Sequence, residues 1–262
     1  MTYIDSWATF SANCQSELYG CTNPNIINYD PFATIDNWTC DYGMTYIPDD
    51  NFEQALINSG IDSDSILNDS IPTNQVKYVE YLNLVYPWNY NFYDTSWQIG
   101  QNINTLTGIE DFTSLTYLNF AFNDISSVDL SQNTNLKTLY TSNNNLSEID
   151  VSSLTDLEKF TCRNNQIANL DLSNNSLLIK IFCENNQLTN LDLRNGNNVN
   201  IISSGWEKLN LTNNPDLNCI DVDDSTYSTA NWTVANGNID SQQYFGTNCN
   251  PIGCTDLNAY NY

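Results

Sequence analysis

Four stretches of the sequence share one pattern: LTYLNFAFNDI at 115–125, LKTLYTSNNNL at 136–146, LEKFTCRNNQI at 157–167 and LIKIFCENNQL at 178–188. Each begins with Leu, has an apolar residue at the fourth position and Phe, Thr or Cys at the sixth, and has Asn at the ninth. The stretches start 21 residues apart, and Val199 continues this spacing. A fixed period of this kind predicts a solenoid of stacked coils.

The second half of each period carries a similar pattern. Residues 125–133 read ISSVDLSQN and residues 167–175 read IANLDLSNN. The array has no stretch with the period or length of an amphipathic helix. We therefore expect a mainly β fold, a solenoid of parallel strands with one strand on each side of every coil. The ninth-position Asn side chains are expected to hydrogen-bond the backbone of the turns and to form a ladder from coil to coil.

These eleven-residue stretches resemble the leucine-rich repeat consensus L-x-x-L-x-L/C-x-x-N-x-L. The second halves, such as Leu170-Asp171-Leu172-Ser173, look like those of the nested 21-residue subclass of bacterial leucine-rich repeats. The resemblance implies the same parallel-strand solenoid and a strand surface that contacts ligands.

Both ends of the array look like caps. Residues 47–57 read IPDDNFEQALI, which predicts a short helix with acidic capping residues that ends near Ser59-Gly60. Residues 79–84 are the expected first strand, followed by an insertion at 85–102 that is rich in aromatic residues. After Val199, Leu209 and Leu217 keep the leucine spacing with an apparent deletion of about three residues.

The flanks carry a second motif. Residues 20–40 read GCTNPNIINYDPFATIDNWTC, and residues 253–262 begin another copy with GCTDLNAYNY. Both resemble the short GCTD…NY…C modules of secreted Bacteroidetes surface proteins, although Asn37-Trp38 replaces the usual acidic-glycine pair. The expected organisation is an upstream segment at 1–19, a Cys module at 20–42, an N-terminal cap at 47–78, the solenoid at 79–222, a C-terminal cap at 223–249 and a second module from 253 to 262.

The eight cysteines fit this organisation. The module implies a Cys21–Cys40 disulfide, and the cap suggests Cys219 with Cys249. Cys162 and Cys183 share one inward column, so we interpret them as core thiols, with a cross-coil disulfide as the alternative. Cys14 and Cys254 lack partners within this pattern, which favours a piece of a longer protein. Paired cysteines in small modules indicate an extracellular setting.

The charge balance excludes several classes of function. With 31 acidic and 7 basic side chains the net charge is −24, so a nucleic acid would be repelled. The absence of histidine removes the usual general base, and nothing marks two carboxylates as a catalytic pair. We therefore expect no enzymatic activity and no cofactor. No apolar run is long enough to span a bilayer.

The predicted binding surface consists of the outward third, fifth and seventh positions of each strand. Basic and aromatic residues gather there, a combination that suits a protein or glycan ligand, above all an acidic one. The candidate residues are Tyr117, Asn119, Tyr140, Lys159, Thr161, Arg163, Lys180, Phe182 and Trp206. The same positions also include Ala121, Thr138, Ser142, Glu184, Ile201 and Ser203.

Other interpretations remain open. The aromatic residues at 86–97 are a second candidate for glycan binding, or they cover the end of the core. Two acidic clusters, Asp62-Asp64-Asp69 and Asp221-Asp223-Asp224, are candidates for calcium. The leading hypothesis is a cell-surface binding or adhesion module; the alternatives are a structural spacer in a large surface protein and an accessory domain of a secreted enzyme.

Overall fold

The computed structural model describes residues 18–24, 29–37, 43–86, 99–205 and 209–249. The chain divides into two compact units, residues 1–44 with 72–74 and residues 45–71 with 75–262. In the first unit, strands β1 (Tyr19–Gly20) and β2 (Ile35–Asp36) pair in parallel. Cys21 is buried and disulfide-bonded. Its predicted partner Cys40 lies outside the described residues, so the Cys21–Cys40 pairing stays a prediction.

The second unit begins with the predicted capping helix. Helix α1 spans Asp50–Asn58, and Asp49 caps it by accepting hydrogen bonds from the backbone N–H groups of Asn51 and Phe52. Fully buried Glu53 accepts hydrogen bonds from the N–H groups of three consecutive residues, which fixes the loop at 68–70 against the helix. Strands β3 (Met44–Tyr46) and β4 (Ser70–Pro72) pair, and helix α2 spans Thr73–Val76.

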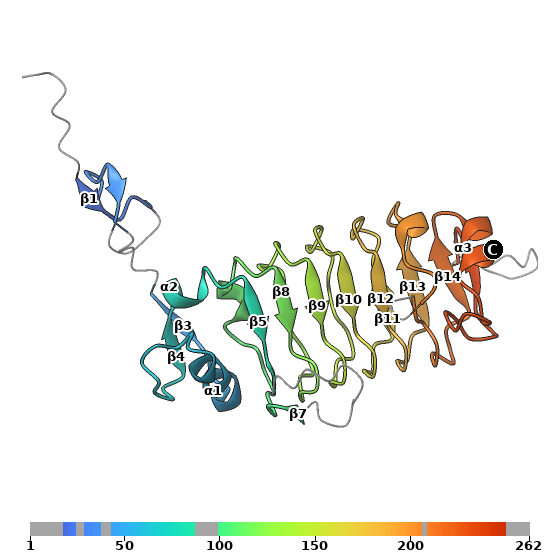
Figure 1. The fold of residues 1–262 in the computed structure, drawn as a ribbon, viewed down its shortest axis with the longest axis horizontal. Helices are drawn as coiled ribbons and strands as arrows, with labels where there is room; N and C mark the ends of the chain where they lie inside the picture. Colours follow the sequence, from blue (N-terminus) through green and yellow to red (C-terminus); the bar gives the residue numbers. More distant parts are fainter. Residues whose placement is uncertain (1–17, 25–28, 38–42, 87–98, 206–208, 250–262) are drawn as a thin grey trace, which may run out of the picture. The chain divides into compact units, whose positions relative to one another are not determined.

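The repeats form one five-stranded parallel sheet, in which the strands lie side by side (Figure 1). Its order is β12-β10-β9-β8-β5, with β5 at Tyr81–Asn83, β8 at Tyr117–Asn119, β9 at Thr138–Tyr140, β10 at Lys159–Thr161 and β12 at Lys180–Phe182. The 21-residue spacing therefore sets the register of the last four strands, as the sequence predicts. Between β5 and β8, strands β6 (Val85–Tyr86) and β7 (Ile99–Gly100) form an antiparallel pair and residues Ile109–Asp111 form a 3-10 helix.

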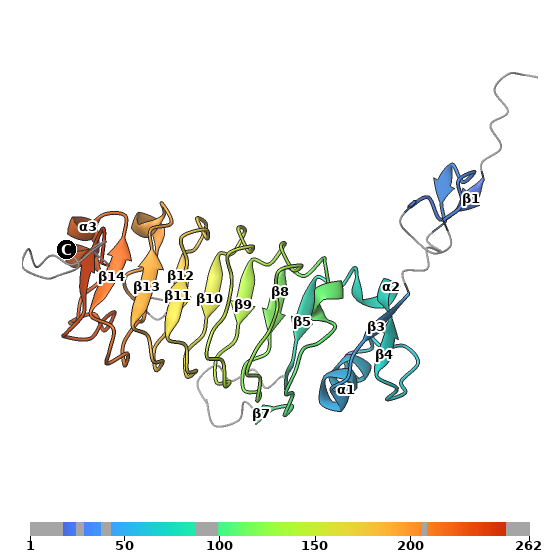
Figure 2. The ribbon, with the colours of Figure 1, turned by 180° about the vertical axis from the view of Figure 1, so that it is seen from behind.

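A second parallel sheet covers the other side of the later coils (Figure 2). It contains β11 (Asn169–Asp171), β13 (Asn190–Leu193), β14 (Cys219–Val222) and β15 (Tyr244–Gly246). The expectation of a strand pair in every coil is wrong for the first coils, which lack this second strand. In the later coils the Asn190 side-chain amide donates to Asn169 Oδ1 at 2.7 Å. Ser127 and Glu148 occupy the equivalent positions earlier in the chain and supply no such amide pair.

One later coil is longer than its neighbours. Phe182 forms a parallel bridge with Asn210, 28 positions away, which is seven more than the repeat length. The expected deletion of about three residues is therefore wrong, because the chain has an insertion here. It begins with a 3-10 helix at Asn198–Asn200, and Val199 is 62% exposed. Val199 thus does not open a fifth coil.

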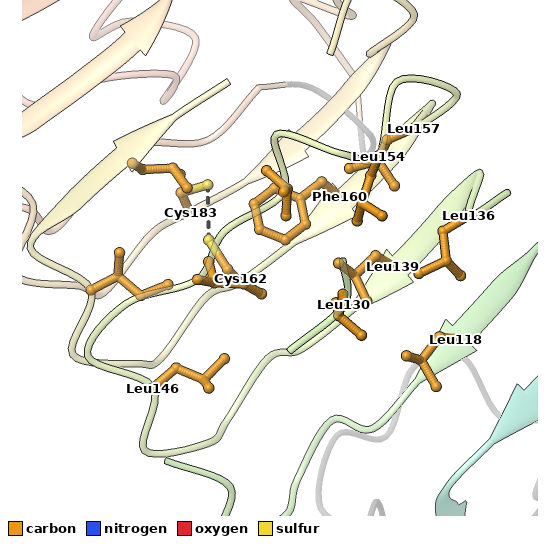
Figure 3. Packing of buried hydrophobic residues seen from close by; sticks show 14 of the residues in the cluster. Leu118, Leu130, Leu136, Leu139, Leu146, Leu154, Leu157, Phe160, Cys162 and Cys183 are labelled. Carbon is orange, nitrogen blue, oxygen red and sulfur yellow. Dashed lines mark hydrogen bonds between the residues drawn. The ribbon is translucent and has the colours of Figure 1, made fainter. Parts of the chain in front are cut away.

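The core is a continuous stack of apolar side chains, with Leu118, Leu139 and Phe160 from successive coils in contact with the rest of the cluster (Figure 3). Cys162 and Cys183 belong to the same stack. Both are fully buried free thiols, and their Sγ atoms lie 3.0 Å apart. Burial raises the pKa of the Cys183 thiol. The interpretation of these residues as core thiols fits the structure, and the alternative of a cross-coil disulfide does not.

The ninth-position Asn residues hold successive coils together. Asn165 Nδ2 donates to the carbonyls of Thr141 in the preceding coil and Cys162 in its own coil, at 3.1 and 3.0 Å, while its Oδ1 accepts the Leu146 N–H at 3.0 Å. Asn144 and Asn186 repeat these contacts. The residue before each of them, such as Asn164 with φ 55°, has a left-handed backbone, which Asn tolerates well.

The C-terminal end of the solenoid is closed by helix α3 (Ser225–Asn231), which Asp224 caps, and by strand β15. Trp232 is fully buried against Phe245. The predicted Cys219–Cys249 disulfide is present and ties the cap to β14. No helix in the described part of the chain is long and apolar enough to cross a membrane.

We expect Asn165→Ala to lower the free energy of unfolding by about 2–4 kcal/mol, because it leaves buried backbone groups without partners. Urea unfolding of the whole chain measures this change. Exposed Asn145 provides the matched control, and Asn145→Ala should change the unfolding free energy by less than about 0.5 kcal/mol. Equal effects of both substitutions would contradict a structural role for the buried ladder.

We expect Cys162 and Cys183 to resist alkylation in the folded protein, because neither is solvent-accessible and the thiolate is the reactive form. Iodoacetamide should modify both residues only after unfolding in guanidinium, as read by mass spectrometry of their peptides. Non-reducing peptide maps that show these two peptides cross-linked would instead establish a disulfide.

Candidate binding face

The register of the five-stranded sheet aligns outward residues into two rows. We call these two rows the strand face. The first row contains Tyr81, Tyr117, Thr138, Lys159 and Lys180, and the second contains Asn83, Asn119, Tyr140, Thr161 and Phe182. Equivalent residues in neighbouring parallel strands lie about 4.8 Å apart. The predicted neighbours Lys159 and Lys180 are therefore adjacent, as are the members of the fifth-position row.

The N-terminal half of the strand face is aromatic. The rings of Tyr81 and Tyr117 stack with centroids 4.2 Å apart and planes 12° apart. Tyr140 meets Tyr117 edge-on, with centroids 5.7 Å apart. Burial, and next the neighbouring Tyr81, raise the pKa of Tyr117, so its hydroxyl stays neutral at physiological pH. These three rings form an aromatic surface that can stack on a flat or apolar ligand group.

The C-terminal half of the strand face is cationic. Lys159 and Lys180 pair in register, and Lys180 Nζ lies 4.9 Å from the centre of the Phe182 ring. Arg163 lies just beyond β10, with its side chain 37% exposed. This half can attract a carboxylate, sulfate or phosphate group while the Phe182 ring packs against the ligand.

The seventh-position residues differ from the sequence expectation. Ala121, Ser142 and Glu184 are all buried, whereas Arg163 is partly exposed. Thr161 in the second row is also only 8% exposed, and its hydroxyl accepts a hydrogen bond from Ser142. Thr161 and the seventh-position residues Ala121, Ser142 and Glu184 therefore contribute little contact surface, and Arg163 is the seventh-position residue that a ligand can reach.

Glu184 and Arg163 form an ion pair at the edge of the strand face. The Glu184 Oε1 to Arg163 Nη1 distance is 3.7 Å, whereas Glu184 Oε2 is buried without a hydrogen-bond partner. Burial raises the pKa of Glu184, and the Arg163 charge offsets part of this effect. Glu184 thus reduces the charge that Arg163 presents to a ligand.

Several residues predicted to bind a ligand are not part of the two rows of the strand face. Trp206 and residues 87–98 of the aromatic insertion lie outside the described residues. Ile201 is buried and precedes the aligned part of its coil, so neither Ile201 nor Ser203 extends the two rows. The 21-residue spacing does not identify Tyr81, because Tyr81 lies 36 residues before Tyr117. The identical tripeptides Tyr81-Leu82-Asn83 and Tyr117-Leu118-Asn119 carry the signal that identifies it.

The acidic clusters serve the fold. Asp62 Oδ1 accepts the Asp64 N–H, and burial raises the pKa of Asp62. At the C-terminal cluster, Asp221 accepts the Cys249 N–H, Asp223 accepts the Gly196 N–H and Asp224 caps α3. A further trio, Asp50, Glu53 and Asp69, has carboxylate oxygens within 4.8 Å of one another. The Glu53 oxygens in this trio already accept backbone N–H groups.

The Glu184→Gln substitution should stabilise the protein more at about pH 7 than at about pH 4. The folded pKa of Glu184 is raised, so the stability that its neutral form contributes is present below the unfolded pKa and is lost as the pH rises through the folded pKa. Gln does not titrate, so the variant does not lose this stability as the pH rises. Urea unfolding at both pH values measures the difference, and the same substitution at exposed Glu148 is the control. A variant whose advantage falls with rising pH contradicts the assignment.

Solved structures of bacterial proteins resemble this fold. The functional domain of InlJ from Listeria monocytogenes matches with a TM-score of 0.50 and 28% identity, over 69% of this chain and 38% of that chain. InlF, an internalin of the same species, matches with a TM-score of 0.44 and 17% identity over 76% and 56% of the two chains. A leucine-rich repeat protein of Leptospira interrogans has a TM-score of 0.39 and 18% identity over 66% and 36%.

The chain thus spans less than two thirds of the length of each of these structures. A scan against protein-family models and a search of curated proteins gave no match. The repeat register, the buried Asn ladder and the similarity to InlJ together show that the repeat domain is a leucine-rich repeat solenoid.

Proposed function

We propose that the chain is an extracellular binding module that uses the strand face to hold a protein or glycan ligand. The observation that carries the proposal is the alignment of Lys159 and Lys180 beside Tyr140 and Phe182 on one surface. Only 7 of the 262 residues are basic, so two adjacent cations on this face stand out against an acidic background. An acidic ligand would be steered to them.

The setting that we propose is the cell surface. The Cys219–Cys249 disulfide and the disulfide-bonded Cys21 are typical of an oxidising compartment. The InlJ domain is described as including a cysteine ladder, and Cys162 and Cys183 stack here in one inner column. These features, together with the flanking modules, favour a secreted, non-enzymatic protein of the nested 21-residue subclass with adhesion as its role.

The test is charge reversal on the strand face. In a screen of acidic glycans and acidic peptides, the Lys159→Glu/Lys180→Glu variant should bind any recovered ligand at least tenfold more weakly than the wild type. Its affinity should also depend less on salt, because two ionic contacts are lost. Both lysines are partly exposed, so the urea midpoint should change little.

The matched control is Lys77→Glu/Lys137→Glu, which makes the same change in net charge outside the two rows. This variant should keep the wild-type affinity within about twofold, since only the diffuse field of the chain changes. Equal losses in both variants contradict a localised site. Unchanged affinity in the strand-face variant moves binding away from these rows, and a screen that yields no ligand supports the spacer role.

A further inference from the structure

A groove of about 840 Å³ lies along the second sheet and the preceding coils, across the core from the strand face. Buried Ile149, Leu170 and Leu191 line it together with the acidic side chains of Asp150, Asp171 and Asp192. A smaller cavity of about 290 Å³ shares the lining residues Ser127 and Val128 and adds Asp129 and Glu110. The groove therefore crosses several coils and combines an apolar surface with carboxylates.

The carboxylates form a column with the pitch of the coils. Asp171, Asp192 and Asp221 align in register, and Asp129 and Asp150 precede them at the 21-residue spacing. Asp129, Asp150 and Asp171 are exposed, and each accepts the N–H of the residue two positions later at 2.9 Å. Hydrogen bonds from the backbone and side chain of Ser131 lower the pKa of Asp129, and hydrogen bonds from the side chain and backbone of Ser152 lower the pKa of Asp150. Asp129 and Asp150 therefore stay charged at neutral pH although they lie in neighbouring coils.

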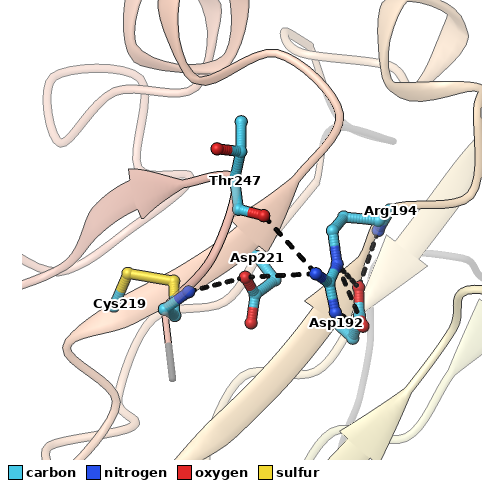
Figure 4. The surroundings of a disulfide bond; sticks show 6 residues. Asp192, Arg194, Cys219, Asp221 and Thr247 are labelled. Carbon is cyan, nitrogen blue, oxygen red and sulfur yellow. Dashed lines mark hydrogen bonds and ion pairs between the residues drawn. A yellow bond between two sulfur atoms is a disulfide. The ribbon is translucent and has the colours of Figure 1, made fainter. Parts of the chain in front are cut away.

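Arg194 shows how a cation sits on this column (Figure 4). Its guanidinium donates from Nε to Asp192, lies 4.0 Å from Asp221 Oδ1 and donates from Nη1 to the Thr247 carbonyl. One guanidinium thus bridges two successive carboxylates. In the part of the chain that the structure describes, no ion pair reaches Asp129, Asp150 or Asp171. Asp171 still interacts electrostatically with Arg194, and Asp129 and Asp150 lie further along the column.

The spacing favours an extended cationic ligand over a metal ion. Among the described residues, the carboxylate trio close enough to share an ion is Asp50, Glu53 and Asp69, which is not in the groove. From the coil of Ser127 to that of Asp221 the groove crosses four strand spacings, about 19 Å. That length matches roughly six residues of extended peptide. Apolar lining beside the acids suits the aliphatic stems of Arg and Lys.

We propose that this groove binds an extended, arginine-rich peptide segment of a partner protein, with its cations on Asp150, Asp171 and the neighbouring carboxylates. The site is independent of the strand face, because the two surfaces belong to different sheets and have opposite charge. The chain would thus hold an acidic ligand on one side and a basic one on the other.

The test uses fluorescein-labelled nona-arginine and the intact chain, with binding measured by fluorescence anisotropy at low salt. Asp150→Asn/Asp171→Asn should weaken binding at least tenfold. Asn keeps a side-chain oxygen for the N–H groups of Ser152 and Ser173, so the urea midpoint should stay unchanged. The matched control is Asp156→Asn/Asp216→Asn, two exposed acids outside the groove, which should bind within twofold of the wild type.

Equal weakening in both variants would show that nona-arginine responds only to net charge and would overturn the proposal, as would absence of binding to the wild type. The Lys159→Glu/Lys180→Glu variant separates this site from the strand face. It should bind nona-arginine at least as well as the wild type, whatever the strand-face screen returns. Loss of nona-arginine binding in that variant would place the peptide on the strand face and would overturn the proposal.

Discussion

The structure depends on the need to satisfy backbone groups between coils. The regular coils bury backbone carbonyl and N–H groups outside their strands, and the ninth-position Asn side chain of each supplies both a donor and an acceptor for them. Because the Nδ2 of Asn165 reaches back to the carbonyl of Thr141, each coil is oriented by its predecessor. The two rows of the strand face and the carboxylate column on the other sheet inherit their alignment from this contact.

The sequence predicts the parts of the structure that the 21-residue repeat determines. The interval between Leu136 and Leu157 determines the register of β9 and β10, and with it the adjacency of Lys159 and Lys180. It predicts less where the chain departs from the repeat. Leucines flank the seven-residue insertion after Asn197. The spacing of these leucines therefore predicts a shortened coil where the chain has a longer one. The sequence also does not predict the burial of Glu184. Alternation along a strand indicates the direction of a side chain but does not indicate which residues cover it.

The sequence predicts strands on the second side of the coils but does not predict the groove that lies there. Its acids were visible in the sequence as the Asp of each second half, yet they were interpreted only as part of the repeat pattern. What makes them a candidate site is their placement beside a groove and the seat that Arg194 takes between Asp192 and Asp221. Neither fact follows from spacing, because spacing aligns the coils and does not determine where the side chains leave a groove or which groups Arg194 contacts. The side-chain amides of Asn169 and Asn190 join two of the later coils, whereas Ser127 and Glu148 at the equivalent earlier positions supply no such pair.

The 21-residue period has an evolutionary consequence. One repeat unit of the gene encodes one position in each row of the strand face and one carboxylate of the opposite column. Duplication or loss of a whole unit by recombination therefore lengthens or shortens both surfaces together, and the Asn contacts allow the new coil to join without redesign of its neighbours. Point substitutions at Lys159 or Asp171 change one surface alone. The lengths of the two surfaces therefore change together, whereas the residues on each surface can change independently.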